Sequence, residues 1–496
     1  MMMATSAVTP AAIPLARLLD RPGCAGGDTP ISGLQLDSRK VRRGDLFLAV
    51  PGDVHDGRQF IEQAVANGAA AVVAEAPLAG FVDALPVPVV ELPELRFDLG
   101  SLAARFYGHP SRDLHMVGVT GTNGKTTTSR LVAQLGRALG HPCGVIGTLG
   151  ATLDDGVSAS ANTTPDPVSL QQQLAQWRDQ GVYAVSMEVS SHALVQGRVN
   201  GVEFETAIYT NLSHDHLDYH GSMDAYGRAK LKLFACPGLR HAVVNLDDNF
   251  APEVIAAATA GARVLTYSSG GAAADVCVRN PRFHALGVDA ELHTPWGSGD
   301  FSSPLPGEFN LANLAAAVTA VVLAGEDLPA VLQAIAKLRP VPGRMQVIPN
   351  GLGLQVIVDY AHTPDALEKV LAALKAHVSG DLITVFGCGG DRDRTKRQVM
   401  GRVACQFSDR VILTSDNPRG EDPAAILADI AAGCSGDYAL LPDRAEAIAE
   451  AIGAAQPGDC VVIAGKGHED YQIIEGERRY FSDEEQARNA LAQRVS

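Results

Sequence analysis

The chain has 496 residues, of which 46% are hydrophobic and 19% are charged, and its formal net charge is −16. This composition supplies apolar material for several packed cores and argues against a disordered chain. The acidic balance disfavours broad binding to nucleic acid, although a local basic pocket could still bind a small anion.

Targeting signals are weak in this chain. The first twenty residues lack a basic stretch and contain two prolines, and no later apolar run reaches membrane-spanning length. Eight cysteines are scattered without a C-x-x-C pair, so we interpret them as reduced, mostly buried thiols. These features predict a cytoplasmic protein.

The chain divides at two turn-rich segments. Residues 1–110 alternate short strand-like and helix-like stretches, which predicts an α/β domain ending in "YGHPSRDL". A second boundary is predicted in "LRPVPGRM" (Leu338–Met345), where two prolines and a glycine interrupt a helical pattern. The length fits about three domains, which we place at residues 1–110, 111–340 and 341–496.

The stretch "VTGTNGKTTTSRL" (Val119–Leu131) follows an apolar run of strand length and precedes a helix-like pattern that includes Leu131, Val132 and Leu135. Unpaired N–H groups at a helix N-terminus attract anions, and Lys125 adds a full positive charge. The stretch therefore predicts a strand, a phosphate-binding loop and a helix, with a nucleotide triphosphate as the ligand.

This loop departs from the usual phosphate-loop pattern. The usual pattern has a glycine five positions before Gly124, where this chain has Val119, and the upstream glycine is Gly121. A generic nucleotide triphosphatase is therefore not the best interpretation. Thr126 would offer its hydroxyl to a magnesium ion, and a glycine-rich turn without a ligand is the plainer alternative.

Acids and histidines follow two apolar runs of the middle segment. They are Glu188, in "MEVSSHAL", and His214, Asp215, His216, Asp218 and His220, in "TNLSHDHLDYHG". Zinc would need three or four close nitrogen or sulfur ligands, whereas a phosphate loop implies magnesium held by few protein groups. We predict magnesium with Glu188 and one histidine; for His214 and His220 ordinary hydrogen bonding is favoured over ligation.

The last third has a repeating pattern. Four apolar runs each end in a polar loop, and helix-like segments such as Pro364–Lys375 lie between them. This predicts a doubly wound sheet. Ligands of such sheets bind beyond the carboxyl ends of the strands. We therefore expect one edge to gather Asp359, Arg392, Asp416, Arg419 and Glu469.

Nine motifs occur in the following order along the chain: "GTNGKTT", "NTTPDP", "MEVSSHAL", "TNLSHDHLDYHG", "LPGEFNLAN", "VDYAHTPDAL", "GCGGDRDRTKR", "DNPR" and "GKGHEDYQ". Together they resemble the Mur ligase family of cell-wall synthesis, over nearly the whole chain from "DSRKVRRGDLF" onward. The resemblance implies an N-terminal α/β domain for a UDP-sugar, a central P-loop ATPase-like domain with a mostly parallel sheet, and a C-terminal Rossmann-like domain for an amino acid. It also implies ATP and Mg²⁺ as cofactors, and we expect a monomer.

Site residues follow from the same resemblance. The ATP phosphates would contact Gly121, Thr122, Asn123, Gly124, Lys125, Thr126 and Thr127, with Asn310, Arg344 and Asp359 near the nucleotide. The uridine nucleotide would contact Leu36, Ser38, Asp53, Val54 and His55. The muramoyl-dipeptide would lie along Asn162, Thr163, Thr164, Ser190, Gln196 and Arg198.

Magnesium ligands implied by the resemblance are Thr126, Glu188, His216 and Lys230. Lys230 matches a lysine that the family carbamylates, because carbon dioxide turns its cation into a carboxylate-like ligand. A solvated helix lysine is the plain alternative. Catalysis is expected from Lys125, Lys230, Glu188 and His216.

The C-terminal loops are expected to choose the amino acid. meso-Diaminopimelate differs from lysine by a second carboxylate, which calls for a planar cation that donates two hydrogen bonds. Arg419 of "DNPR" is that candidate, although four residues alone would suggest a surface turn. The resemblance adds Arg392, Asp416, Asn417, Pro418, Gly465 and Glu469, and is closest to members that extend UDP-N-acetylmuramoyl-L-alanyl-D-glutamate with meso-diaminopimelate.

The implied reaction activates a carboxylate with ATP. The D-glutamyl γ-carboxylate attacks the γ-phosphate to give an acyl phosphate and ADP, and the amine then displaces phosphate. Ligases that add lysine or D-alanyl-D-alanine and folylpolyglutamate synthetases are alternatives, against which "DNPR" and "DSRKVRRGDLF" argue. An ATP-driven switch protein is a further alternative, but it leaves the C-terminal loops without a purpose.

Overall fold

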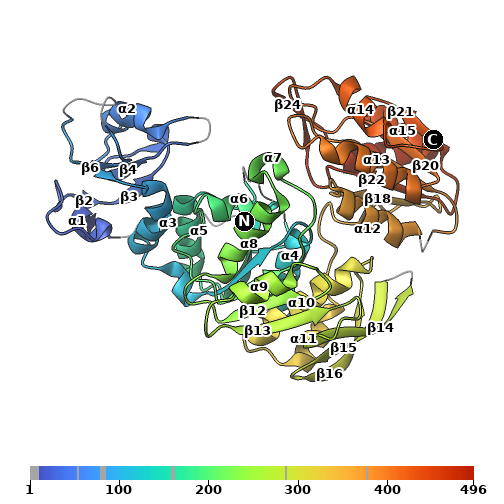
Figure 1. Cartoon of the computed structure of the whole chain (residues 1–496), viewed down its shortest axis with the longest axis horizontal. Helices are drawn as coiled ribbons and strands as arrows, with labels where there is room; N and C mark the ends of the chain where they lie inside the picture. The colour runs from blue at the N-terminus through green and yellow to red at the C-terminus, as the bar shows by residue number, and fades with distance from the viewer. Residues whose placement is uncertain are drawn as a thin grey trace.

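The computed structural model describes residues 11–52, 55–78, 85–156, 158, 162–284, 287–375 and 378–495. They form three regions, coloured blue, cyan to yellow, and orange to red in Figure 1, and each region contains one larger, mainly parallel sheet covered by helices. This confirms the predicted α/β class. The predicted domain limits stay a prediction.

The N-terminal region has a four-stranded parallel sheet, formed in chain order by β3 (Gly33–Gln35), β4 (Asp45–Ala49), β5 (Ala71–Glu75) and β6 (Val89–Leu92). Strands β4 and β5 are almost wholly buried, as their continuous apolar runs predict for a sheet covered on both faces. One face packs against α1 (Leu15–Leu19) and α3 (Leu95–Phe106), and the other against α2 (Ile61–Ala66). A short pair, β1 (Ile13–Pro14) and β2 (Pro30–Ile31), adjoins α1.

The central region has a ten-stranded sheet of order β16-β15-β14-β13-β12-β11-β7-β10-β8-β9. Its strands are β7 (His115–Thr120), β8 (Cys143–Gly147), β9 (Gly150–Thr152), β10 (Ala184–Glu188), β11 (Thr206–Tyr209), β12 (His241–Asn245), β13 (Arg263–Ser268), β14 (Val276–His284), β15 (Gly287–Thr294) and β16 (Gly297–Ser303). The strands from β8 to β14 in this order run parallel, and the pairings β14·β15, β15·β16 and β8·β9 are antiparallel.

Helices cover both faces of this sheet. One face packs against α4 (Lys125–Ala138), α10 (Phe309–Leu323) and α11 (Leu328–Ile335). The other packs against α5 (Pro167–Asp179), α6 (Ser191–Val195), α8 (Met223–Phe234) and α9 (Ala251–Ala257), while α7 (Leu217–His220) is a short turn before α8. Leu131, Val132 and Leu135 of α4 are buried, which confirms the predicted helix face.

The C-terminal region has a six-stranded sheet of order β17-β18-β22-β19-β20-β21. Its strands are β17 (Gln346–Val347), β18 (Gln355–Asp359), β19 (Leu382–Phe386), β20 (Arg410–Leu413), β21 (Tyr438–Leu440) and β22 (Cys460–Ala464), all parallel except β17. A hairpin of β23 (Tyr471–Ile474) and β24 (Glu477–Tyr480) follows β22.

Apolar side chains cover both faces of the C-terminal sheet. The helices α12 (Pro364–Lys375), α13 (Thr395–Phe407) and α14 (Pro423–Ala431) pack on one face, and α15 (Arg444–Ala454) and α16 (Asp483–Val495) on the other. The predicted doubly wound sheet is therefore confirmed, and α12 has the predicted bounds. All eight cysteines are free thiols, but only four are buried, so the prediction of mostly buried thiols holds for half of them.

Candidate active site

The phosphate loop joins β7 to α4, as the sequence predicts. The N–H of Thr122 donates to the backbone oxygen of Asn211 (2.9 Å), and the N–H of Asn123 donates to the side-chain oxygen of the same residue (2.9 Å). Gly121 has a φ of +150°, and a Cβ there would collide with the hydroxyl of Thr210. The segment after β11 thus braces the loop, and the close approach requires glycine.

Lys125 is the first residue of α4. Its Nζ donates to the backbone oxygens of Gly121 and Thr122, each at 2.8 Å. Burial lowers the pKa of Lys125, while Glu188 and Asp215 act in the opposite direction. The amine is therefore held inside the loop, where it and the helix N-terminus can together attract an anion.

Glu188 ends β10 beside the same helix start and is 1% exposed. Its Oε2 accepts from the hydroxyl of Thr126 (2.9 Å), and its Oε1 accepts from the N–H of Thr148 (2.8 Å). The hydroxyl of Thr126 also accepts from Nη2 of Arg344 (3.0 Å). Oxygen donors from two elements meet here, which suits an ion that takes few protein ligands.

Lys230 lies on α8 and is 1% exposed. It forms no ion pair with any residue that the structure describes, and its Nζ lies 4.0 Å from the centre of the Tyr226 ring. Burial, with the Lys125 cation nearby, holds the pKa of Lys230 well below its usual range. The alternative of a solvated helix lysine is therefore wrong.

His216 caps α7 with a left-handed φ of +55°, and its ring contacts that of Tyr226. Its Nε2 lies 3.4 Å from Oδ2 of Asp215, and burial lowers the pKa of His216. Asp215 is also approached from the C-terminal region, by Nε2 of His362 (3.9 Å) and Nζ of Lys396 (4.0 Å). A neutral imidazole and a carboxylate therefore face the C-terminal region.

The other two histidines of this segment form hydrogen bonds. The Nε2 atom of His214 lies 2.7 Å from Oδ2 of Asp393, and that of His220 lies 2.9 Å from the hydroxyl of Ser191. Ordinary hydrogen bonding was the favoured interpretation for both. The contact of His214 additionally links the central and C-terminal regions.

Two of the candidate dipeptide residues, Thr164 and Ser190, lie beside Glu188. The hydroxyl of Thr164 donates to the backbone oxygen of Glu188 (2.9 Å) and accepts from the N–H of Ser190 (3.2 Å). The guanidinium of Arg198 donates to the backbone oxygen of Thr164 (3.1 Å). Three other members complete the group: Thr163 contacts Thr148 (3.2 Å), Gln196 contacts Tyr219 (3.4 Å) and Asn162 is exposed.

The candidate uridine contacts lie in the N-terminal region. Leu36 and Ser38 follow β3, and the hydroxyl of Ser38 donates to Oε1 of Gln63 (2.7 Å). The ring of His55 lies 6.5 Å from that of Phe60. Asp53 and Val54 lie outside the described residues. The geometry thus leaves these assignments as predictions.

A pocket of about 220 Å³ opens where the central and C-terminal regions meet. Its lining includes Asp215, His216 and Asp218 from the centre and Arg392, Asp416, Asn417, Arg419, Gly465 and Glu469 from the C-terminal loops. Arg392, Asp416, Arg419 and Glu469 are therefore found at one edge of the sheet, as predicted. Asp359 does not line the pocket, but the next residue, Tyr360, does.

Arg419, in the predicted "DNPR" loop, is held by backbone oxygens. Its Nη1 donates to the oxygens of Gly390 (2.8 Å) and Asn417 (3.4 Å), and no carboxylate of the described residues lies within ion-pair distance. Burial and the nearby Arg392 lower the pKa of Arg419. A fixed guanidinium without a counter-ion is suited to bind a carboxylate.

The acids of this pocket differ in their partners. Oε2 of Glu469 accepts from Nδ2 of Asn417 and from Nζ of Lys466, both at 3.0 Å, whereas Asp416 has no ion-pair partner among the described residues. Lys466 is fully buried, and the sequence reasoning missed it although it lies in the quoted "GKGHEDYQ" motif. Of these two acids from the C-terminal loops, Asp416 is therefore the one that no described Lys, Arg or His side chain pairs with.

The three residues predicted near the nucleotide differ from one another in their hydrogen-bond partners. Arg344 reaches Thr126, as described, and Asn310 accepts from Asn313, whose own oxygen accepts from the hydroxyl of Thr128 on α4 (3.2 Å). Asp359 instead accepts from the backbone N–H groups at positions 345 and 361, at 2.6 and 2.7 Å, and burial raises its pKa. Its carboxylate thus shapes the segment that leads into the C-terminal sheet.

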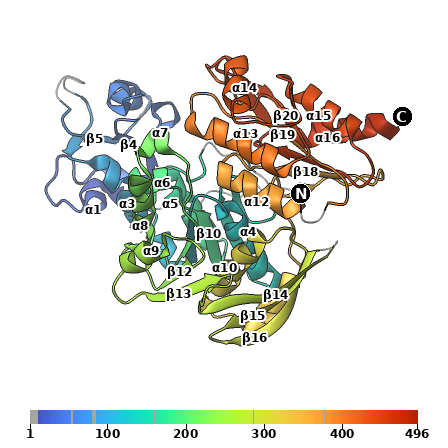
Figure 2. The same ribbon diagram turned by 45° about the vertical axis from the view of Figure 1, so that its right-hand side comes forward.

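A contact between the phosphate loop and α12 was also missed. Nδ2 of Asn123 donates to Oδ2 of Asp365 (2.8 Å), and Figure 2 shows α12 beside α4. Lys396 and His362 likewise approach Asp215 across the same boundary. These pairings join residues more than 140 positions apart, so no local pattern could reveal them.

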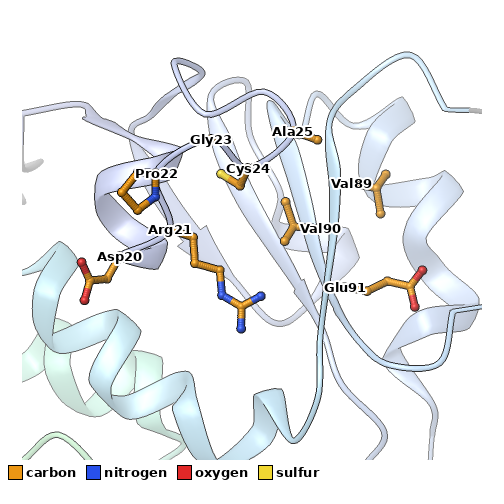
Figure 3. A pocket seen from close by; sticks show the side chains of 9 residues that line it. All are labelled: Asp20, Arg21, Pro22, Gly23, Cys24, Ala25, Val89, Val90 and Glu91. Carbon is orange, nitrogen blue, oxygen red and sulfur yellow. The ribbon is translucent and has the colours of Figure 1, made fainter.

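A larger hollow, of about 660 Å³, lies in the N-terminal region and is shown in Figure 3. Residues 20–25 and 89–91 line it, including Arg21, Cys24 and Glu91. It is open to solvent and holds none of the predicted site residues. The smaller pocket is the better candidate because charged groups of two regions converge there.

Within the described part of the chain, no three His, Cys, Asp or Glu side chains are grouped as ligands of a metal ion. None of the described helices combines the length and hydrophobicity needed to cross a membrane.

Known proteins share this architecture. Family models match at residues 30–107 (Mur ligase family, catalytic domain), 119–321 (Mur ligase middle domain) and 343–467 (Mur ligase, glutamate ligase domain). A Pseudomonas aeruginosa relative, named UDP-N-acetylmuramoyl-L-alanyl-D-glutamate--2,6-diaminopimelate ligase, is 51% identical over 467 residues, covering 94% of this chain and 96% of the relative.

Solved structures agree. One, of a protein with that same name, aligns with a TM-score of 0.71 at 41% identity, covering 98% of this chain and 100% of the other. A MurF ligase from Thermotoga maritima in complex with ADP aligns with a TM-score of 0.66 at 19% identity, covering 93% and 98%. The second likeness supports the fold alone.

Proposed function

Because the chain belongs to the Mur ligase family, we propose that it is an ATP-dependent ligase that joins meso-diaminopimelate to the D-glutamyl γ-carboxylate of UDP-N-acetylmuramoyl-L-alanyl-D-glutamate. The product is a precursor of peptidoglycan. The relative from Pseudomonas aeruginosa carries this activity in its name, and its similarity covers 94% of the chain. The observation that carries the proposal is Arg419, a pocket guanidinium without a counter-ion among the described residues.

ATP would bind with its phosphates in the loop Gly121–Thr127. On binding, Nζ of Lys125 would exchange its two carbonyl contacts for phosphate oxygens, since both lie within reach of the loop interior. The N–H groups at the start of α4 add partial positive charge. Positioning and charge neutralisation, without a covalent protein nucleophile, are what phosphoryl transfer requires.

Magnesium fits the oxygen donors around Glu188, and its ligands would be Thr126, Glu188, His216 and Lys230 as a carbamate. When bound, the ion would neutralise negative charge on the phosphates. Burial and the nearby Lys125 cation hold the pKa of Lys230 well below its usual range, which favours the uncharged amine. That nitrogen can attack the carbon of CO₂, forming the N–C bond and losing a proton, so that an anionic ligand replaces an uncharged amine.

The amino acid would lie in the pocket between the central and C-terminal regions. Arg419 would bind the distal carboxylate of diaminopimelate and Asp416 its distal ammonium, which leaves the reacting amine to face the centre. Thr164, Ser190 and Arg198 would hold the dipeptide beside Glu188. We place the reaction in the cytoplasm, where ATP is available, and expect a monomer.

The activity is tested by combining the protein with ATP, Mg²⁺ and the UDP-linked dipeptide, and then adding meso-diaminopimelate, lysine or no amino acid. We expect phosphate release and a product whose mass has increased by one diaminopimelate residue only in the first mixture. Equal extension by lysine would reject the proposed amino acid. Phosphate release that is independent of any amino acid would instead favour an ATP-driven switch.

The carbamate is tested with Lys230→Ala. We expect activity to fall by about 100-fold or more, the scale of losing one charge-stabilising group, and to return in part when a small carboxylate such as acetate is supplied to fill the cavity. Lys232→Ala, on the exposed face of the same helix, is the control. Failure of every small carboxylate to restore activity, together with an unmodified Lys230 by mass spectrometry, would reject the carbamate.

A further inference from the structure

A fully buried ion pair lies behind the amino-acid pocket. Arg444, the first residue of α15, donates from Nε and Nη2 to the two carboxylate oxygens of Asp483, each at 2.7 Å. Both side chains are 0% exposed. Asp483 begins α16, so its carboxylate also lies at a helix N-terminus, which favours negative charge.

The remaining donors of Arg444 hold the ends of two strands. Nη2 donates to the backbone oxygen of Ala464 (2.9 Å), the last residue of β22, and Nη1 donates to that of Ser415 (3.4 Å), just beyond β20. The next residues along the chain are Gly465 and Asp416, and both line the pocket.

These two pocket loops are packed directly on each other. Gly465 has a left-handed φ of +116°, and a Cβ there would approach Oδ2 of Asp416 to 2.7 Å. A small shift of either strand end would therefore move the Asp416 carboxylate. A planar guanidinium that binds one carboxylate and two carbonyls fixes the spacing of those carbonyls, because its five N–H donors have a rigid geometry.

We propose that Arg444, oriented by Asp483, is a positioning residue that sets the geometry of the amino-acid pocket and hence its selectivity for diaminopimelate. This rests on the proposed function for the identity of the ligand. Arg444 does not line the pocket and acts through the backbone at Ser415 and Ala464. A role in stability alone would leave substrate affinity unchanged once folding is preserved.

The test replaces both partners, Arg444→Met with Asp483→Leu, because removal of one partner alone would leave an unpaired buried charge, whereas apolar replacement of both is often tolerated. We expect the KM for meso-diaminopimelate to rise by about tenfold or more, the scale of one or two lost hydrogen bonds, while the KM values for ATP and the nucleotide substrate stay within about twofold. Arg444→Lys keeps the charge without the planar fork, and should have an intermediate KM.

Ile452→Ala is the matched control, since Ile452 is a fully buried apolar residue of the same helix and is not among the residues that line the pocket. It should lower the melting temperature and leave the KM for meso-diaminopimelate unchanged. An equal rise in the KM for the amino acid in this control would assign Arg444 to stability alone and overturn the inference.

A second readout does not depend on activity. In the double variant, hydrogen exchange should speed up by about tenfold in the segments 412–419 and 463–469 and stay unchanged in β19, because a lost anchor lets those strand ends open locally. Unchanged exchange overturns the inference whether or not the wild type is a ligase. An inactive wild type with accelerated exchange in the variant would reject only the proposed function. If the double variant does not fold, Arg444→Lys takes its place in both measurements.

Discussion

The phosphate loop and the amino-acid pocket are built in opposite ways. The loop is one continuous stretch, in which a strand, two glycines, a lysine and a helix start follow each other along the chain. The pocket draws its side chains from the segment after β11 in the central region and from C-terminal loops after β18, β19, β20 and β22, and these four loops alone span more than a hundred residues. A contiguous site can be found from its motif, whereas a dispersed site depends on sheet order and on buried anchors.

The largest expected effect tests the contiguous site. Lys125→Ala should lower kcat/KM for ATP-dependent product formation by about 10³-fold, because a charge directed at the phosphates is lost. Initial rates of ADP release measure it, and the exposed Lys232→Ala serves as the control. An unchanged rate would show that the loop has another role.

The next effect tests the dispersed site. Arg419→Ala should raise the KM for meso-diaminopimelate by about 100-fold while ATP binding is retained, because a charge-assisted pair of hydrogen bonds is removed from a pocket. Arg419→Lys should recover only part of the loss, since an ammonium cannot form the same fork. Equal losses of ATP and amino-acid binding would contradict the separation of the two sites.

A smaller effect is expected where the two sites meet. Asp365→Ala removes the hydrogen bond from Asn123 and should lower kcat by about threefold, in the range of a partly exposed polar contact. Glu368→Ala, an exposed acid on the same helix, is the control. Steady-state rates at saturating substrates measure both variants, and identical rates would mean that this contact does not support the reactive arrangement.

The smallest effect concerns pH. Burial lowers the pKa of His468 to about 3, from an ordinary value of 6.5, and its buried Nδ1 has no hydrogen-bond partner among the residues that the structure describes. Between these values the unfolded chain binds a proton that the folded chain does not, so stability is complete above about pH 6.5 and falls as the pH is lowered. The free energy of unfolding should therefore decrease less steeply below pH 6.5 in His468→Gln than in the wild type, by roughly 1 kcal/mol per pH unit.

Thermal unfolding at two pH values measures this difference, with His293→Gln, an exposed residue of β15, as the control. An identical pH dependence in the wild type and in His468→Gln would show that the imidazole binds its proton equally well in the folded and the unfolded chain, and would contradict the effect of burial.

Much of the fold could be predicted because it rests on local patterns. The bounds of α12, the strand and helix around the phosphate loop, and the sheet of the C-terminal region follow from apolar periodicity and turn residues. The antiparallel extension β14–β16 could not be foreseen in the same way, because β14 and β16 are largely exposed and β15 buries only every second residue, so none of them has a continuous apolar run.

The site was predicted unevenly for the same reason. Arg392, Asp416, Arg419 and Glu469 could be placed at one edge because strand ends determine where loops gather. Lys466, Asp365 and the pair Arg444–Asp483 could not, because their importance comes from burial and from partners that are distant in sequence. The nucleotide contact expected of Asp359 stays a prediction, and in the structure its carboxylate binds nearby backbone N–H groups.

The position of β22 has a consequence for synthesis on the ribosome. This strand is the last of the six in the sequence but lies between β18 and β19, so those two strands have no direct pairing without it. A nascent chain that ends before residue 460 must therefore keep two apolar strand edges unpaired. Emergence of one five-residue segment converts them into a continuous sheet, so the sheet of the C-terminal region cannot close before β22 is made, and its open edges are exposed to misassociation until then.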